Sequence, residues 1–421
     1  MKMKKHILAL ALGSAIMTTL LSGCGSSKEI TFTEGEEKTE LTFSWWGPDD
    51  RNEYTIAAVK QFEKQHPDIK VNLEYSEFSG FKEKTDIKMK AHREADVMQL
   101  NYSWVIGYSP EGKGFYNLKN VSDVLNLENY DEDVLAYGMI QDSLNALPIA
   151  QNGHVFLYNK TIYDKYGLEI PDSWEDIYAA AEVMKPDGIY PLDLGGVAMW
   201  FTCVAYQEQV SGKSILTDEG TLNFSQKDLE EMISFYVDLV KKGVVEDISA
   251  RTDYKVSDGI YAGTVQWINS VDKFGGYIEK AGGSNVIGKT PVLSGASRTG
   301  WYVRPATMYA ISANTTHPKE SAILLEYLVA GEDMAMGQLL DKGIPFNKSA
   351  KAVLEENDAL EGLMNDAANE VDATETYLMH PNFENSTLSD SFKNACVSVL
   401  YNEVSVEDAA ATAYELMKED L

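Results

Sequence analysis

The sequence is poor in the residues that build disulfide frameworks and metal centres. Its 421 residues include three cysteines, none in a CxxC pair, which excludes a disulfide-stapled scaffold. The six histidines lie far apart, and no HExxH or comparable spacing that would hold zinc is present. We therefore expect neither a metal nor a cofactor in this chain.

Positive charge is also scarce. Lysine and arginine total 36 against 65 aspartate and glutamate, which gives a formal net charge of −29. Such an acidic chain repels phosphates, so binding to nucleic acid, or to a membrane surface through basic residues, is disfavoured. Aromatic residues nevertheless make up 10% of the chain, with 23 tyrosines and 7 tryptophans, far more than a disordered acidic chain contains. The sequence therefore predicts a folded protein, and its length favours roughly two or three domains.

The N-terminus has the pattern of an export signal. Three lysines precede an apolar run over residues 7–21, and these 15 residues are short for spanning ~30 Å of hydrocarbon. The motif LSGC at residues 21–24 resembles the bacterial lipobox, in which cleavage precedes the cysteine and lipid is attached to its thiol. We expect residues 1–23 to be a lipoprotein signal peptide. Lipid on Cys24 would then anchor the protein at the outer face of the cell membrane.

A polar segment over residues 24–40, rich in glycine, serine, threonine and glutamate, predicts a flexible tether. Folded structure should then begin near Leu41. Cys203 and Cys396 remain as thiols after the tether. Whether they pair stays open, and separate small buried side chains are the favoured interpretation.

Strand and helix patterns alternate after the tether. This order, with short connections, predicts parallel strands covered by helices. The expected strands are residues 41–45, 69–75 and 95–100, and the expected helices are 51–65 and 81–92. Ligands bind beyond the carboxyl ends of such strands, where residues 46–51 and 101–104 stand.

The α/β character continues downstream. Ser-x-x-Asp capping boxes at Ser173 and Ser225 open two of the expected helices. The further strands are expected at 148–158, 264–269 and 308–312, and the further helices at 173–184, 225–243, 318–330 and 406–418. No internal repeat and no proline-rich linker divides the chain, which is typical of two domains connected by several crossings.

Four stretches, in order, resemble the extracellular solute-binding proteins of ABC sugar importers, the family that includes maltose-binding protein. They are LTFSWWGPDDRNEYTIAAVKQFEKQHPDIKV, ADVMQLNYSW, LPIAQNGHVFLYNKTIYDKYGL and ISANTTHPKESAILLEYLVAGEDMAMGQLLDKGIPFNKSA. The resemblance covers nearly all of residues 41–421. Ala95 replaces the proline of the family's PDVM strand, and the glycine-rich turn before that strand is missing.

The resemblance implies an α/β protein with the type II periplasmic-binding-protein fold, in which two α/β lobes are joined by a hinge around a central ligand cleft. The first lobe would comprise residues 41–149 and 302–345, and the second residues 150–301 and 346–421. It also implies a monomeric binding protein, not an enzyme. Such a protein would deliver an oligosaccharide to the permease subunits of an ABC importer in the membrane.

The candidate ligand residues follow from the chemistry of sugars, whose C–H faces stack on aromatic rings while their hydroxyls bond to amides, carboxylates and guanidinium groups. Adjacent Trp45 and Trp46 face opposite sides of a strand, so we expect Trp46 at the cleft and Trp45 in the core. Trp267 and Asn269 are two apart and would share a strand face. The candidates are Trp46, Asp49, Arg51, Asn101, Trp104, Asn152, Trp200, Trp267, Asn269, Trp301 and Arg304. Each tryptophan has core filler as its alternative, and Asp49 has a helix cap as its alternative.

Arg51 and Arg304 bear on the charge of the ligand. The segment WWG…R before a helix resembles a subgroup of the family that takes up pectin-derived oligogalacturonides. Arginine binds a uronate carboxylate with two parallel hydrogen bonds, which a neutral sugar does not require. A neutral oligosaccharide, with both arginines structural, is the alternative.

Two other classes of function stay open, a surface lipoprotein glycoside hydrolase and a binding protein for a non-sugar solute such as a polyamine or a phosphodiester. No spacing marks a carboxylate pair for glycoside hydrolysis. Residues 283–290 match the phosphate-loop pattern GxxxxGK[ST]. A helix-like segment precedes this motif and Pro291 follows it, so we expect no nucleotide site there.

Overall fold

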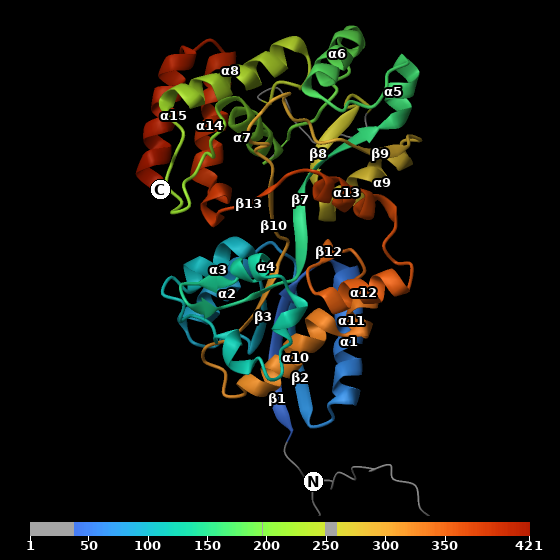
Figure 1. Ribbon diagram of the computed structural model, residues 1–421, viewed down its shortest axis with the longest axis vertical. Coiled ribbons are helices and arrows are strands. Elements are labelled where there is room, and N and C mark those ends of the chain that lie inside the picture. Colours follow the sequence, from blue (N-terminus) through green and yellow to red (C-terminus); the bar gives the residue numbers. More distant parts are fainter. Residues whose placement is uncertain (1–37, 196, 249–258) are drawn as a thin grey trace, which may run out of the picture. The chain divides into compact units, whose positions relative to one another are not determined.

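The computed structural model describes residues 38–195, 197–248 and 259–421. The predicted signal peptide, Cys24 and the tether up to residue 37 lie outside these ranges. The described chain forms two lobes, each a β-sheet covered by helices, and it passes between them more than once (Figure 1). No helix in these three ranges has the length and apolar character that crossing a membrane requires.

The first lobe is built on a sheet with the strand order β2-β1-β3-β11-β6. β1 pairs in parallel with β2 and β3, as predicted, whereas β11 runs antiparallel to both β3 and β6. The strands are β1 (Thr39–Trp46), β2 (Ile69–Ser76), β3 (Val97–Leu100), β6 (Leu147–Pro148) and β11 (Met308–Ile311). β1 begins before Leu41, inside the expected tether, because Thr39 and Glu40 already pair with Ile69 and Lys70.

Alternation along β1 fixes which side chains enter the core of this lobe. Leu41, Phe43 and Trp45 are fully buried, and the Trp45 ring stacks on both Phe43 and Tyr75. The prediction that Trp45 belongs to the core is therefore confirmed. The helices here are α1 (Asp49–Gln65), α2 (Phe81–Lys90), α3 (Tyr102–Tyr108), α4 (Glu132–Ala136), α10 (Pro318–Ala330) and α11 (Glu332–Gln338), with short turns η1 (Leu118–Val121) and η2 (Leu127–Asn129) and the hairpin β4 (Met139–Ile140) and β5 (Ser143–Leu144).

Helix α1 starts differently from the expected capping arrangement. Pro48 occupies the N-cap position and no side chain caps the helix, while Asp49 and Asp50 are its first two residues. The interpretation of Asp49 as a helix cap is therefore wrong. Both carboxylates stabilise the helix through its dipole, whose positive end lies in the first turn.

The second lobe is built on a six-stranded sheet with the central order β12-β7-β10-β13, and β8 and β9 also pair with β7. β7 is long enough to pair with β12 and β10 near its start and with β8 and β9 farther along. The strands are β7 (Ala150–Asn159), β8 (Gly263–Trp267), β9 (Asn285–Gly288), β10 (Tyr302–Pro305), β12 (Ile344–Pro345) and β13 (Tyr377–Leu378). β9 runs through the phosphate-loop-like motif, and the helix that such a motif requires does not follow it directly, as the sequence indicated.

Helices cover this second sheet, and two of them begin as the sequence indicates. Ser225 and Asp228 form a reciprocal capping box on α8, and the Ser173 side chain accepts a hydrogen bond from the Asp176 amide at the start of α6. Cys203 and Cys396 are free and buried in the same apolar core. The helices are α5 (Lys160–Tyr166), α6 (Trp174–Met184), α7 (Ala198–Ser211), α8 (Gln226–Lys242), α9 (Val271–Lys280), α13 (Gly362–Ala373), α14 (Ser386–Leu400) and α15 (Val406–Asp420), with turns η3 (Lys185–Asp187), η5 (Ile268–Ser270) and η6 (Pro381–Glu384).

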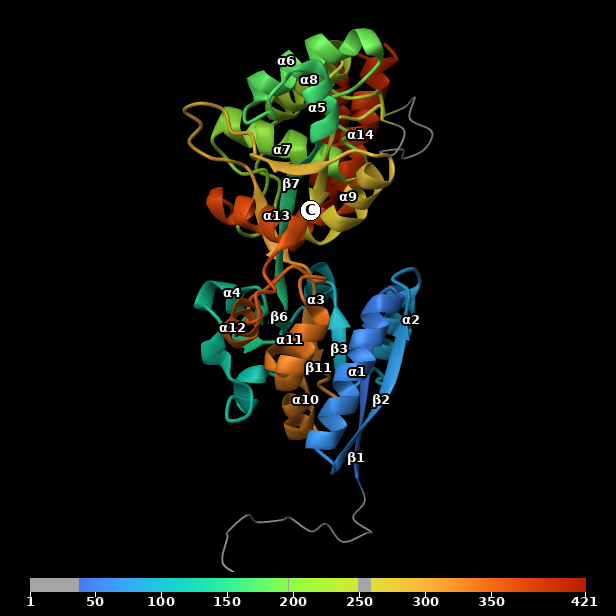
Figure 2. The same cartoon turned by 90° about the vertical axis from the view of Figure 1, so that its right-hand side faces the viewer.

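The connections between the lobes determine where a ligand can bind. The chain passes from β6 directly into β7, and from β10 back into β11. β10 and β12 pair with β7, whereas α12 (Lys348–Glu356) packs on α11 (Figure 2). The proposed lobe boundaries, with residues 302–345 in the first lobe, stay a prediction. The carboxyl ends of β1 and β3 point toward the second lobe (Figure 2).

Candidate functional site

A pocket of about 380 Å³ lies where the two lobes meet. Tyr102, from α3 of the first lobe, contributes to one side, and its hydroxyl donates a hydrogen bond to the Met379 carbonyl at 3.1 Å. The second lobe supplies the other walls. They are formed by Ser214, Leu216, Thr217, Asp218, Arg298, Tyr302, Tyr377, Leu378, Met379, His380, Pro381 and Phe383.

Arg298 supplies the one guanidinium group among the residues that line this pocket, and three neighbours fix its position. Its Nε donates to a carboxylate oxygen of Glu208, and its Nη2 donates to the Tyr302 hydroxyl at 2.9 Å. Its Cζ lies 3.6 Å from the ring centroid of Tyr377, which is a close cation–π contact. The Arg298 side chain is 18% exposed, so it is held rigidly and still reaches the pocket.

Glu208, on α7, is the anchor behind Arg298. Its side chain is 0% exposed, and it also accepts hydrogen bonds from the Ile215 amide and the Tyr302 hydroxyl, both at 2.8 Å. Burial raises the pKa of the Glu208 carboxyl above its usual value, and Arg298 opposes that rise by favouring the charged form. The buried pair is thus a preformed part of the pocket wall.

Aromatic rings make up much of the remaining wall. The Tyr302 ring lies 4.8 Å from Phe383 and 6.1 Å from Tyr377, measured between ring centroids. Trp200 is buried behind this wall, where its Nε1 donates to the Phe383 carbonyl at 3.0 Å. These rings offer flat apolar faces on the side of the pocket that also holds Arg298.

His380 closes the same wall beside the loop that carries Asp218. Its Nδ1 accepts a hydrogen bond from the Asn382 amide, and burial lowers the pKa of its imidazole below the usual value, although Asp218 opposes this. Gly220 packs against the ring with a backbone φ of +79°, and a Cβ there would lie 2.3 Å from Cε1 of His380. Only glycine therefore fits this turn without displacing the imidazole.

The structure brings together four of the predicted residues beside this pocket. Arg304 and Asn152 are partners in the pairing of β10 with β7, and the Asn152 amide donates to the Asn269 side chain at 3.2 Å. The Arg304 guanidinium lies 4.5 Å from the Trp267 ring. Asn269 is on η5 rather than on β8, so the expectation that it shares a strand face with Trp267 is wrong, because the chain turns directly after Trp267.

Arg304 is already engaged by protein groups. Its Nη2 forms an ion pair with Glu384 at 3.0 Å, and its Nη1 donates to the Pro305 carbonyl at 2.7 Å. Its Nε has no hydrogen-bond partner among the described residues. His154 also lies against Trp267, with ring centroids 3.8 Å apart.

A second set of aromatic rings, the aromatic platform, lies at the edge of the first lobe. It consists of Trp46, Phe78, Phe81 and Trp104, and Trp46 contacts the other three at centroid distances of 5.3 to 5.6 Å. Phe78 is 55% exposed and stacks on Trp104 at 6.0 Å. β1 ends at Trp46, and Trp104 is on the same short helix as Tyr102, which places the platform at the end of the lobe that meets the pocket.

The other predicted residues lie in structural positions. Arg51 donates from Nε to Asp341 at 2.7 Å, and Asp341 also accepts from the Tyr54 hydroxyl. The Asn101 side chain caps α3 by accepting from the Ser103 amide. Trp301 is buried and its Nε1 donates to the Pro291 carbonyl. Asp49 is exposed on the first turn of α1.

Sequence reasoning missed the side chains that line the pocket itself. None of the predicted ligand residues lines it. Asn101 and Trp301 are next in sequence to the lining residues Tyr102 and Tyr302, and Arg304 pairs with Glu384, which follows the lining residue Phe383. Tyr302 stands between the predicted residues Trp301 and Arg304, so its neighbourhood carried a signal. Arg298 and Tyr377 stand in segments without a periodic pattern, and nothing local in the sequence marks them.

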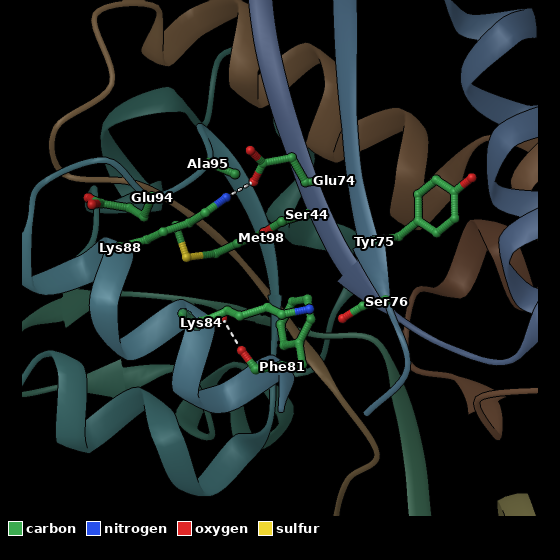
Figure 3. Close-up of a pocket in the computed structure, with 11 residues that line it drawn as sticks. Ser44, Glu74, Tyr75, Ser76, Phe81, Lys84, Lys88, Glu94, Ala95 and Met98 are labelled. Carbon is green, nitrogen blue, oxygen red and sulfur yellow. Dashed lines mark hydrogen bonds and ion pairs between the residues drawn. The ribbon is translucent and has the colours of Figure 1, made fainter. Parts of the chain in front are cut away.

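A smaller pocket of about 100 Å³ lies between α2 and the first sheet (Figure 3). Lys88 and Glu74, which form an ion pair, line it together with the apolar side chains of Phe81 and Met98. It holds little more than a few water molecules and is formed by one lobe alone. In the described part of the chain, no group of three or more histidine, cysteine, aspartate or glutamate side chains is arranged to hold a metal.

The chain is similar to known solute-binding proteins. A family model described as bacterial extracellular solute-binding protein matches residues 57–363. An uncharacterised ABC transporter extracellular-binding protein of Pyrococcus horikoshii is 23% identical over 440 residues, covering 99% of this chain and 97% of that protein.

Two solved structures extend this likeness to three dimensions. A periplasmic solute-binding protein from Pectobacterium atrosepticum is 26% identical, with a TM-score of 0.85 over 91% of this chain and 98% of that one. A periplasmic oligogalacturonide-binding protein from Yersinia enterocolitica, solved with saturated digalacturonic acid, is 26% identical, with a TM-score of 0.80 over the same shares. The predicted type II periplasmic-binding-protein fold is therefore confirmed.

Proposed function

We propose a substrate for this chain, which belongs to the bacterial extracellular solute-binding protein family and is the substrate-binding protein of an ABC transporter. The substrate is an oligosaccharide that contains uronate residues, and it is held between the two lobes. Proteins of this family bind solutes and are not enzymes, so the chain captures the saccharide without breaking a bond.

The observation that carries this proposal is the composition of the pocket between the lobes. Tyrosine and phenylalanine rings, hydroxyls and one guanidinium converge on a volume of about 380 Å³. Rings stack on the C–H faces of sugars, each contributing on the order of 1 kcal/mol, while hydroxyls and guanidinium bond to the polar rim. A polyamine would need a carboxylate-rich pocket, and here Asp218 is the one carboxylate among the lining residues.

The Yersinia enterocolitica structure supports the uronate part of the proposal. That protein carries saturated digalacturonic acid and shares its fold with this chain over most of both lengths. A dianionic ligand needs cationic partners, and Arg298 supplies one in the pocket of this chain.

The proposal includes delivery and anchoring. Closure of the lobes on the saccharide releases water from the pocket and presents the loaded protein to the permease subunits of the importer. Lipid on Cys24 holds the monomeric protein at the outer face of the membrane. Replacement of Cys24 by serine should move the protein from the membrane fraction to the soluble fraction of its host, and retention in the membrane fraction rejects the anchor.

A thermal-shift screen tests the substrate. Residues 24–421 with Cys24→Ser are incubated with galacturonate oligomers, neutral oligosaccharides, spermidine and glycerophosphodiesters, and the saccharide products are separated by chromatography. We expect a saturable rise in Tm with galacturonate oligomers and no shortened products, because stabilisation grows as RT ln(1 + [L]/Kd). Shortened products would favour a surface hydrolase, stabilisation by spermidine or a phosphodiester alone a non-sugar solute, and no shift with any saccharide rejects the proposal.

A further inference from the structure

The geometry points to Arg298 as the residue that selects acidic over neutral saccharides, with one end of its guanidinium free to bind a carboxylate through two hydrogen bonds. This inference rests on the proposed function and adds the residue that gives the site its preference for charge. Sequence patterns had directed attention to Arg51 and Arg304 instead.

The hydrogen bonds of Arg298 leave one edge of the guanidinium available. A guanidinium has five N–H groups, and the bonds to Glu208 and Tyr302 use the Nε hydrogen and one hydrogen of Nη2. The Tyr302 hydroxyl itself donates to the other carboxylate oxygen of Glu208 at 2.8 Å, which places both partners on the same edge of the guanidinium. Nη1, for which the described residues provide no hydrogen-bond partner, and the second hydrogen of Nη2 form the opposite end. That end has the fork geometry that matches two carboxylate oxygens.

The surroundings hold the Arg298 guanidinium in one place in the pocket wall. The Tyr377 ring lies 3.6 Å beneath Cζ and the Tyr302 ring lies 5.6 Å from it, so the guanidinium plane is confined by rings as well as by its hydrogen bonds. A confined fork loses little freedom on binding. Arg298 therefore selects ligands by the position of their carboxylate better than a mobile surface lysine would.

Neither of the other two arginines has a comparable free end on the pocket. The two groups that hold Arg51, the Asp341 side chain and its carbonyl, lie outside the lining of this pocket. Arg304 is 7% exposed, and Glu384 and the Pro305 carbonyl occupy its Nη2 and Nη1. A ligand carboxylate at Arg304 would have to displace Glu384, whereas at Arg298 it displaces no protein group.

The charges that face Arg298 set the size of the expected preference. Glu208 neutralises it from behind, and Asp218 lines the same pocket with negative charge. An acidic saccharide therefore gains one charge-assisted pair of hydrogen bonds, without a further attraction to net positive charge in the pocket. Such a pair corresponds to roughly 100-fold in affinity.

The test uses two saccharides that differ at the carboxylate. Digalacturonate and 4-linked galactobiose share a skeleton, and the second carries CH₂OH where the first carries COO⁻. Calorimetric titration compares the wild-type protein with R298Q. We expect R298Q to lose about 100-fold in affinity for digalacturonate and less than about 3-fold for galactobiose. Equal loss for both ligands, or unchanged binding of digalacturonate, overturns the inference.

R298K keeps the test decisive if R298Q folds poorly. Lysine keeps the charge beside Glu208 and loses the planar fork, so R298K should stay folded and lose about 10-fold for digalacturonate alone. The Tm without ligand reports folding of each variant. R304Q and R51Q are measured beside them, and a selective loss of digalacturonate binding in either one, with R298Q unaffected, assigns the carboxylate elsewhere.

Failure of the proposed function has a different signature. If the wild-type protein binds neither saccharide, nor any saccharide of the thermal-shift screen, then the proposed function is wrong and the inference falls with it. If the wild-type protein binds digalacturonate and R298Q binds it equally well, the proposed function stands and only the role of Arg298 is wrong.

Discussion

The pocket wall of the second lobe and the aromatic platform of the first lobe are built from different chemistry. The aromatic platform of the first lobe, Trp46 with Phe78, Phe81 and Trp104, presents rings, and Lys82, whose Nζ lies 6.0 Å from the Trp104 ring centroid, is already paired with Asp86. The wall of the second lobe combines rings with the Arg298–Glu208 ion pair, hydroxyls and His380.

This difference suggests a division of labour between the lobes. Ring faces stack on sugars of every kind, since each pyranose has an apolar face, so a platform of rings adds affinity with little selectivity. Charged forks and hydroxyls discriminate, because a ligand without the matching group leaves them unpaired. We expect the first lobe to contribute affinity for saccharides in general and the second lobe to contribute selectivity among them.

The largest expected effect concerns the buried charge of the second wall. Glu208→Ala leaves Arg298 without its counterion and the Ile215 amide and Tyr302 hydroxyl without their acceptor. Removing one partner of a buried pair costs about 3–5 kcal/mol of folding free energy. Urea denaturation of the ligand-free protein measures this loss.

Two other carboxylates provide matched controls for Glu208. Asp164 pairs with Lys160 in the second lobe, and its side chain is 59% exposed, so Asp164→Ala should cost less than about 1 kcal/mol. Glu111 pairs with Lys113 on the open surface, and Glu111→Ala should have no measurable effect. A Glu208→Ala protein as stable as these controls would show that the second wall does not depend on its buried charge.

A buried histidine makes the second lobe sensitive to acid. Burial, assisted by the charge of Arg304, lowers the pKa of His154 from 6.5 to about 3. The unfolded chain therefore binds one more proton than the folded protein between pH 6.5 and pH 3, and the free energy of unfolding falls as the pH drops through that range. Between pH 7 and pH 5 this residue alone should remove about 2 kcal/mol of stability.

Denaturation of the wild-type protein and His154→Phe at both pH values isolates this contribution. Phenylalanine can occupy the same place against Phe201 and Trp267, whose ring centroids lie 4.1 and 3.8 Å from that of the imidazole, and it takes up no proton. The difference in stability between pH 7 and pH 5 should shrink by about 2 kcal/mol in the variant. An unchanged difference would mean that His154 is not held neutral by its surroundings.

Much of the fold was predictable because it follows from local periodicity. Alternation along β1 placed Trp45 in the core, and the order of strands and helices indicated a parallel sheet. Ser225 and Asp228 marked the start of α8 through a capping box that forms as expected. The cap expected at Asp49 did not form, because Pro48 takes that position and Asp49 already belongs to the helix.

The pocket was far less predictable, since its side chains are positioned by distant segments. Arg298 stands in the irregular stretch before β10, and its direction is set by Glu208, ninety residues away in the sequence, and by Tyr377 on β13. Periodicity assigns faces to strands and helices but gives no direction to a side chain in a loop. Arg304 was singled out because a guanidinium can bind a uronate carboxylate, but the structure gives it a partner within the protein, Glu384.

The smallest expected effect tests the first lobe. Phe78 is 55% exposed, so Phe78→Ala removes the open ring of the aromatic platform with little disturbance of the core. Digalacturonate and 4-linked galactobiose should both bind about 5-fold more weakly, because one stacked ring contributes on the order of 1 kcal/mol. Tyr401, 57% exposed at the end of α14, provides a matched control whose replacement by alanine should leave both affinities unchanged. A loss confined to digalacturonate would contradict the division of labour, since it would give the ring platform a share in the recognition of charge.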